Sequence, residues 1–365
     1  MRIVIAPDSF KGTAAAHQVA AALAEGWLRE RPDDEVVQVP LADGGEGTID
    51  AFERAVPGAI RHAIAVTDIN GTGERMAEWL LLPDGTAIIE QAACGGLADL
   101  DELNPLGASS RGLGDAIRAA VEFGAERILI GLGGSASNDG GAGLLQSLGA
   151  AVSDEMRWPV EPGNAGLAHV TAVDTEGLIA LPAGGVQVAV DVRNPMLGPD
   201  GAIAVFGPQK GVRAEQVDAM DARLARLAAL LGIDPETPGT GAGGGAAAAL
   251  LAWGAEIVPG SQTIATVAGL GEALLGADWV ITGEGRYDGQ TAAGKVPALV
   301  AEWAQRAGVP TLLVAGRIDA PAQHAQHAVS LVEIAGDESV AMRDTLAVLE
   351  SAGSALAAWS SAKAS

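Results

Sequence analysis

Residues 131–143 (GLGGSASNDGGAG) carry the combination of residue types that is most informative about chemistry in this chain. Glycines let backbone N–H groups approach an anion without obstruction, and a helix start adds unpaired N–H groups and the positive end of its dipole. An apolar run precedes this loop and a helix-like run follows it. The loop therefore indicates binding of a nucleotide or a phosphoester, although glycine turns also join strands to helices in proteins that bind nothing there.

Three of the four lysines directly adjoin a glycine: Lys11 in FKG, Lys210 in QKG and Lys295 in GKV. Because the chain otherwise uses arginine for its charged faces, these lysines are candidates for point charges that face a phosphate or a carboxylate. For each lysine taken alone, the alternative is an exposed charge on a loop.

Two stretches come close to known nucleotide-binding motifs. Residues 289–296 (GQTAAGKV) fit GxxxxGK, yet Val296 stands where a P-loop requires Ser or Thr for magnesium, so a standard P-loop is rejected. Gly131 and Gly133 fit a dinucleotide fingerprint with Ala136 in place of the third glycine. No strand ending in an acidic residue follows at the usual distance, which makes NAD binding the weaker alternative.

Short apolar runs alternate with helix-period segments, which predicts βαβ units and a mainly parallel sheet. The expected strands are residues 2–6, 35–40, 87–90, 127–131, 187–191, 278–282 and 311–315. Ligands of open α/β sheets collect at the carboxyl ends of the strands. Five such ends carry carboxylates, amides and glycines: PDSFKG, ADGGEGT, GLGGSASNDGG, DVRNP and TGEGRYDG. Each single Asp or Asn also has an ordinary role as a helix cap or turn former.

Length and composition set further bounds. A chain of 365 residues is expected to form two domains of roughly 100–200 residues each. The formal net charge of −24 argues against nucleic acid and anionic membrane surfaces as partners. Cys94 is the only cysteine, which excludes an internal disulfide and a cysteine-based zinc site. The N-terminal apolar run is too short for a signal peptide, and residues 237–255 predict a glycine turn and a buried helix, so a cytoplasmic protein is expected.

Six motifs, in order along the chain, resemble the bacterial type I glycerate kinase family. They are PDSFKG from Pro7, ADGGEGT from Ala42, GLGGSASNDGGAG from Gly131, DVRNPMLGP from Asp191, FGPQKG from Phe206 and TGEGRYDGQTAAGKVP from Thr282. The resemblance implies transfer of the γ-phosphoryl group of ATP to D-glycerate in glycerate and glyoxylate catabolism. It favours 2-phosphoglycerate as the product, with 3-phosphoglycerate as the alternative. One departure is Arg111, at a position where an aromatic residue is expected in many relatives.

The same resemblance implies a fold of two α/β domains. A discontinuous Rossmann- or flavodoxin-like domain would comprise residues 1–72 and 285–365, and a second α/β domain, residues 73–284, would be inserted into it. The active site would lie in the interdomain cleft.

The resemblance also implies roles in ATP binding. The ATP phosphates would be held by Gly133, Gly134, Ser135, Asn138, Asp139 and Lys295, with Lys210 as a catalytic cation. Mg²⁺ would bridge the phosphates through one or two carboxylates, for which Asp191 and Asp288 are the candidates.

Glycerate is a small anion with two hydroxyl groups, so its site should pair the carboxylate with a cation and the hydroxyl groups with acceptors. Lys11 or Arg286 is assigned to the carboxylate, and Asp8, Asp43 and Glu284 to the hydroxyl groups. Asp191 and Asp8 compete for the role of catalytic base. For Asp43, capping of the helix that follows the glycine turn is the alternative.

Two competing functions keep the same fold: an NAD(P)-dependent hydroxyacid oxidoreductase and a non-catalytic sensor of a sugar acid or nucleotide. An oxidoreductase would change nicotinamide absorbance with glycerate alone, whereas a kinase would release ADP only when glycerate is present. The sequence decides neither the phosphorylated position of glycerate nor the oligomeric state, which leaves a homo-oligomer open.

Overall fold

A computed structural model of the chain describes residues 1–10, 12–42, 45, 47–288 and 296–364. Helices and mainly parallel strands alternate along this part of the chain, which confirms the predicted α/β class. The chain divides into two units. Unit 1 comprises Met1–Asp43, Asp50–Pro57 and Ser261–Ser365, and unit 2 comprises Gly44–Ile49 and Gly58–Gly260.

Unit 1 is built on a five-stranded parallel sheet with the strand order β13-β12-β11-β1-β2. The strands are β1 (Arg2–Ile5), β2 (Glu35–Gln38), β11 (Trp279–Tyr287), β12 (Thr311–Ile318) and β13 (His327–Ser330). Counted along unit 1 this is the flavodoxin-like order, in which the direction of winding reverses between the first and third strands. That point lies here between β1 and β11, whose residues Val4 and Val280 are register partners.

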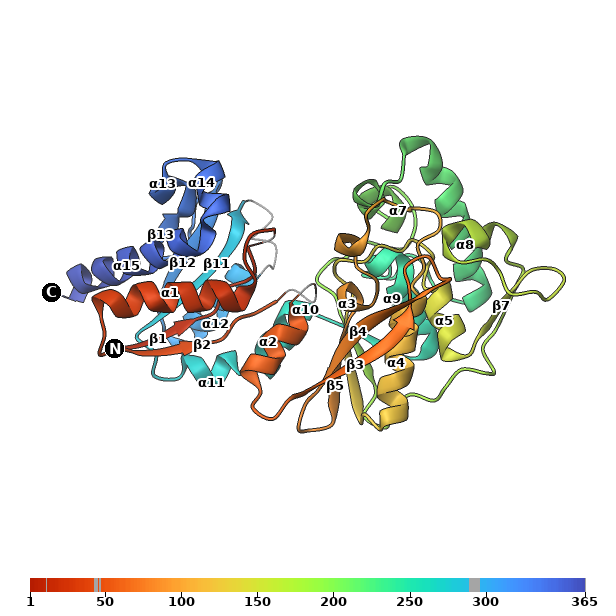
Figure 1. Cartoon of the computed structure of the whole chain (residues 1–365), viewed down its shortest axis with the longest axis horizontal. Coiled ribbons are helices and arrows are strands. Elements are labelled where there is room, and N and C mark those ends of the chain that lie inside the picture. Colours follow the sequence, from red (N-terminus) through yellow and green to blue (C-terminus); the bar gives the residue numbers. More distant parts are fainter. Residues whose placement is uncertain (11, 43–44, 46, 289–295, 365) are drawn as a thin grey trace. The chain divides into compact units, whose positions relative to one another are not determined.

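Helices cover both faces of this sheet because β1 is apolar on both sides. Ile3 and Ile5 belong to a core with α1 (Ala16–Glu30), α13 (Leu331–Ala335), α14 (Glu338–Arg343) and α15 (Thr345–Ala364). Val4 belongs to a second core with α10 (Gly260–Val267), α11 (Leu270–Leu274) and α12 (Val296–Ala307). The red α1 and the blue α15 lie side by side (Figure 1). Their close approach requires Gly26, where a Cβ would meet the carbonyl oxygen of Glu350 at 1.9 Å.

Unit 2 contains a six-stranded mixed sheet with the order β10-β9-β6-β5-β4-β3. The four parallel strands are β5 (Thr86–Glu90), β6 (Arg127–Gly131), β9 (Val186–Ala189) and β10 (Glu256–Val258). Two antiparallel strands, β3 (Ile60–Thr67) and β4 (Glu74–Leu81), were not predicted. They form a hairpin at the edge of the sheet.

The core of unit 2 lies between this sheet and α4 (Arg111–Phe123), α5 (Ala142–Leu148) and α9 (Ala246–Trp253). A glycine turn precedes the buried helix α9, as residues 237–255 predicted. The remaining elements are α2 (Thr48–Ala55), α3 (Gln91–Gly95), α6 (Gly163–Gly166), α7 (Ala202–Phe206), α8 (Val217–Leu231) and the strand pair β7 (Ala151–Ser153) and β8 (Ala172–Asp174). Throughout the described ranges, every helix is too short or too polar to cross a membrane.

The boundaries of the two units differ from the predicted ones, and the sheets explain why. The predicted break after residue 72 falls in the turn between β3 and β4, which pair along their whole length from Ile60↔Leu81 to Thr67↔Glu74. The predicted break after residue 284 falls inside β11, which pairs with β1 and β12 of unit 1. Because the hydrogen-bond ladder of a sheet joins neighbouring strands, each pair stays within one unit.

Candidate active site

Asp8 lies at the carboxyl end of β1, where the winding of the unit 1 sheet reverses. Its backbone N–H donates to the carbonyl of Gly283 at 2.8 Å, which ties the loop after β1 to β11. The N–H of Ser9 donates to Oδ1 of Asp8 at 2.7 Å. The Asp8 residue is only 6% exposed, so this backbone contact helps to hold its carboxylate in place.

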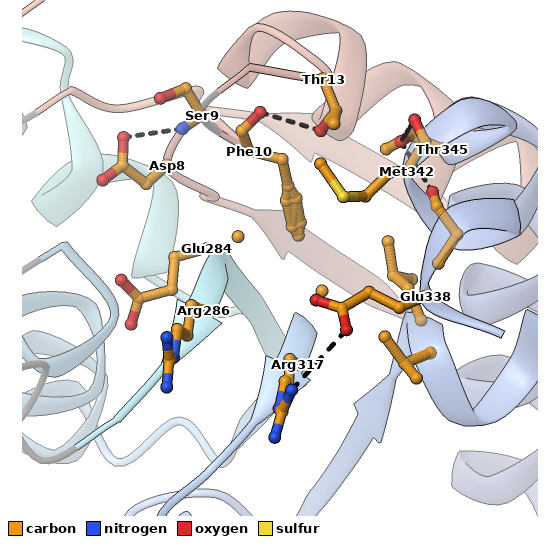
Figure 2. Close-up of a pocket in the computed structure, with 15 residues that line it drawn as sticks. Asp8, Ser9, Phe10, Thr13, Glu284, Arg286, Arg317, Glu338, Met342 and Thr345 are labelled. Carbon is orange, nitrogen blue, oxygen red and sulfur yellow. Dashed lines mark hydrogen bonds and ion pairs between the residues drawn. The ribbon is translucent and has the colours of Figure 1, made fainter.

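Glu284 and Arg286 lie on β11, two residues apart and therefore on the same face of the strand. With Asp8 they line a pocket of about 330 Å³ within unit 1. Figure 2 shows Asp8 and Glu284 on one side of this pocket and Glu338 and Met342 on the other. The structure thus brings together three of the side chains that the sequence assigned to substrate binding.

Arg317 is a pocket residue that the sequence analysis missed. It is the register partner of Arg286 on the neighbouring strand β12, and it also lines the pocket. The Nε atoms of both arginines donate to the carboxylate of Asp319, at 2.8 Å from Arg286 and 2.7 Å from Arg317. The hydrogen bond from Arg317, with the charges of both arginines, lowers the pKa of Asp319. The predicted strand ended at Ala315, and its extension through GRI would have revealed this residue.

One wall of the same pocket is apolar. The apolar residues that line it are Phe10, Leu331, Val332, Ala341 and Met342. They come from the loop after β1 and from helices α13 and α14, which begin beyond the carboxyl end of β13. The pocket therefore combines carboxylates, guanidinium groups and hydrocarbon surface.

The glycine loop of unit 2 connects β6 to α5 and is fixed by its neighbours. The N–H of Leu97 donates to the carbonyl of Gly134 at 2.7 Å, and the N–H of Ala136 donates to the carbonyl of Gly95 at 3.3 Å. Gly134 has a φ of 72°, a backbone conformation that favours glycine. Gly133 is half-buried and Gly134 is exposed, whereas residues 135–141 are buried.

Asp139 is fully buried and its carboxylate organises this loop. It accepts hydrogen bonds from the N–H and Oγ–H of Ser110, both at 2.9 Å, and from the N–H groups of Gly141 and Gly143 at 3.1 and 3.2 Å. Four donors from two segments meet at one carboxylate. The geometry therefore indicates a supporting role behind the loop surface for Asp139.

Asn138 is also fully buried. Its Nδ2 donates to the carbonyl of Pro105 at 3.2 Å, while its Oδ1 has no hydrogen-bond partner within the described part of the chain. Ser135 is buried beside Ser137, with their Oγ atoms 3.3 Å apart. The side chains of the predicted phosphate loop thus point mainly into unit 2, which leaves the backbone of Gly133 and Gly134 as its accessible part.

Lys210 is the cation that the structure brings to this loop. Its Nζ donates to the carbonyl of Ser137 at 2.6 Å, and the residue is only 3% exposed. Burial lowers the pKa of the ammonium group to about 8, and the negative charge of Asp139 acts in the opposite direction. Lys210 follows the loop by more than 70 residues in sequence, and the fold brings the two together.

Glu90 ends β5 and Asp191 follows β9, and these two strands flank β6 in the sheet. Ala189 of β9 and Glu90 of β5 are both register partners of Gly131, so all three strands end at the same edge of the sheet. Asp191 is exposed just beyond β9. Glu90 is buried, and its carboxylate accepts a hydrogen bond from the N–H of Ile49. Glu90, which the sequence analysis missed, therefore holds the backbone directly after the ADGGEGT motif.

Three predicted site residues, Lys11, Asp43 and Lys295, lie outside the described residues. In the described ranges no group of three or more His, Cys, Asp or Glu side chains is close enough to hold a metal ion. Asp288 lies in unit 1 and Asp191 in unit 2. Taken singly, either carboxylate suits Mg²⁺, which commonly uses one or two carboxylates and takes its other ligands from phosphates and water.

The chain is similar to known proteins over the region that contains these motifs. The sequence model of the glycerate kinase family matches residues 3–361. The chain is 41% identical to the glycerate 2-kinase of Escherichia coli K12 over 345 residues, which cover 91% of this chain and 90% of that protein. It is 40% identical to the glycerate kinase of Bacillus subtilis 168, with 87% and 85% covered. A crystal structure of a candidate glycerate kinase 2 from Salmonella typhimurium LT2 superposes with a TM-score of 0.85 at 38% identity, covering 100% of this chain and 99% of that one.

Proposed function

We propose, because the chain belongs to the glycerate kinase family, that it transfers the γ-phosphoryl group of ATP to D-glycerate and yields 2-phosphoglycerate. As a member of this family the chain is a kinase, a phosphotransferase with an alcohol group as acceptor, and its substrates are small molecules. The observation that carries the proposal is the family match over residues 3–361, which spans all six motifs. Neither an oxidoreductase nor a sensor has a comparable observation in its favour.

Phosphoryl transfer requires little covalent chemistry from the protein, since positioning and stabilisation of charge supply most of the catalysis. We propose that the accessible backbone N–H groups of Gly133 and Gly134 face the ATP phosphates, and that the N–H group of the buried Ser135 adds positive potential behind them. Asn138 and Asp139 support the loop from behind, as their burial and hydrogen bonds suggest. Lys295 remains a proposed phosphate ligand.

Lys210 supplies positive charge to the base of the phosphate loop. With a pKa of about 8, its ammonium group is mostly protonated at neutral pH. One of its three donors is used by the carbonyl of Ser137. We propose that its positive charge acts through the loop from the buried side and stabilises charge that develops on the phosphoryl oxygens during transfer.

Either Asp191 or Asp288 would hold Mg²⁺, which would supply positive charge beside the phosphates. The attacking hydroxyl group of glycerate needs a carboxylate that orients or deprotonates it, and Asp191 and Asp8 are the proposed bases. In unit 1, Asp8 and Glu284 are proposed to accept hydrogen bonds from substrate hydroxyl groups, and Arg286 to pair with an anion. Lys11 and Asp43 remain proposed substrate ligands.

Phosphorus NMR of a reaction with ATP and D-glycerate tests both the activity and the position of the phosphate. We expect ADP to form only when D-glycerate is present. A phosphate on position 2 couples to one proton and gives a doublet, whereas a phosphate on position 3 couples to two protons and gives a triplet. Formation of a triplet would replace the proposed product, and absence of any phosphoglycerate would remove the proposed activity.

A further inference from the structure

The pocket of unit 1 offers more than a three-carbon acid requires. Its volume of about 330 Å³ lies within the range of pockets that hold ligands of drug size. Glycerate consists of three carbons and four oxygens, so it presents polar groups on nearly every side. The apolar wall formed by Phe10, Leu331, Val332, Ala341 and Met342 therefore has no partner on glycerate. The lining suits a ligand that carries an apolar or aromatic part beside polar groups that hydrogen-bond to carboxylates and guanidinium groups.

The position of the pocket in the sheet points to the kind of ligand. Asp8 follows β1, and Glu284 lies on β11. The flavodoxin-like strand order reverses between these two strands. In open α/β sheets, nucleotides bind at the carboxyl ends of the strands at this reversal. The reaction of a kinase supplies one ligand with an aromatic base and vicinal hydroxyl groups, namely ATP.

We infer that this pocket binds the nucleoside part of ATP, with the base against the apolar wall and the ribose hydroxyl groups toward Asp8 and Glu284. The inference rests on the proposed function and revises one part of it. In this arrangement Asp8 and Glu284 accept hydrogen bonds from the ribose hydroxyl groups, and glycerate binds elsewhere. Of the two proposed bases, this leaves Asp191.

The lining suits a planar base. The thioether of Met342 packs favourably on aromatic rings, and the guanidinium group of Arg317 can lie against a ring face. Two carboxylates lie against Arg317: Asp319 accepts from its Nε at 2.7 Å, and Glu338 lies 3.7 Å from its Nη1. Figure 2 shows Met342, Phe10 and Arg317 around the same space. Carboxylates that accept from ribose hydroxyl groups are the usual device of dinucleotide-binding folds.

Val332→Phe tests the inference because it fills the apolar end of the pocket from α13. The matched control is Ile334→Phe on the same helix, since Ile334 is 38% exposed and does not line the pocket. We expect Val332→Phe to raise the KM for ATP about tenfold or more, in line with the cost of a misfit in an apolar pocket. The KM for D-glycerate and the inhibition constant of inorganic tripolyphosphate, which has no nucleoside, should stay within about twofold of wild type.

A second variant keeps the test valid if Val332→Phe misfolds. Met342→Ala removes a side chain that is 57% exposed and should raise the KM for ATP a few-fold, whereas Met156→Ala, at a residue that is 68% exposed in unit 2, should not. A raised KM for D-glycerate with unchanged ATP kinetics would overturn the inference and return the pocket to glycerate. Unchanged kinetics in both variants would also overturn it. Either result leaves the proposed function standing, because wild-type phosphoglycerate formation is measured separately.

Discussion

Both units carry polar residues at the carboxyl edge of a sheet, but the two sets are used differently. In unit 2, Asp139 and Lys210 are buried and bonded to the backbone of the glycine loop. In unit 1, Asp8, Glu284 and Arg286 line a pocket. The conspicuous polar residues of the unit 2 loop thus mainly set its shape and leave its backbone accessible, whereas the side chains of unit 1 line an open pocket.

Asp139→Ala should have the largest effect on stability. It leaves several buried donors without an acceptor, each at a cost of about 1–3 kcal/mol, so the free energy of unfolding should fall by about 3 kcal/mol or more. Urea denaturation measures this. The control is Asp154→Ala, because Asp154 accepts from the N–H groups of Met156 and Trp158 in an exposed turn. A loss of similar size in both variants would contradict the special role of Asp139.

Lys210 should give stability a distinctive dependence on pH. Its pKa is about 8 in the folded chain, against a reference value of 10.5, so the unfolded chain binds more protons between these pH values. Stability linked to Lys210 is therefore fully present above pH 10.5 and is lost as the pH falls through 8. Relative to Lys210→Met, wild type should gain on the order of 3 kcal/mol over this window.

Urea denaturation at the two ends of this window measures the difference between wild type and Lys210→Met. Lys363→Met is the control, because Lys363 is exposed near the end of α15. A difference that does not change with pH would show that the ammonium group is not buried as described, and the comparison between the units would lose its main cationic element.

Asp191→Asn and Asp8→Asn separate chemistry in unit 2 from binding in unit 1. Loss of the base should lower kcat of Asp191→Asn about a hundredfold, with little change in the KM for ATP. Asp8→Asn should mainly raise the KM for ATP. Asp200→Asn, at an exposed residue downstream of Asp191, is the control. A large loss of kcat in Asp8→Asn with near wild-type turnover in Asp191→Asn would reverse the comparison.

Asp319→Asn should have the smallest effect. Arg286 and Arg317 are 66% and 54% exposed, and ion pairs of exposed side chains contribute about 0–1 kcal/mol. The free energy of unfolding should change by less than about 1 kcal/mol, and the KM for ATP should rise less than about fivefold. Steady-state kinetics of Asp319→Asn measure the change in KM. The control is Asp344→Asn, because the carboxylate of Asp344 pairs with Arg343 on α14. A hundredfold effect would mean that the arginine pair contacts the reacting phosphate.

Strands and motif positions were accessible to sequence analysis because they depend on local patterns. The apolar run of residues 127–131 predicted β6 with the bounds found in the structure. The hairpin of β3 and β4 escaped because its residues, such as His62 and Glu78, interrupt the apolar pattern and its pairing is antiparallel. The unit boundaries differed from the predicted ones because strand partners such as β1 and β11 lie far apart in sequence.

The site was predictable in part. The sequence selected Asp8, Glu284 and Arg286, which meet at one pocket, and it linked Lys210 to the glycine loop. Arg317 was missed because its role arises from register with Arg286 across two strands. The proposed roles of Lys11, Asp43 and Lys295 stay predictions.

Sequence alone was enough to predict the α/β class, the glycine loop, the motifs that identify the family and the exclusion of an internal disulfide. These follow from residue types and short spacings. The folded chain was needed to show that Asp139 and Lys210 are buried behind the loop, and that an apolar wall from α13 and α14 completes the pocket of unit 1. Burial and side-chain orientation depend on which distant segments pack together, and local patterns do not contain that information.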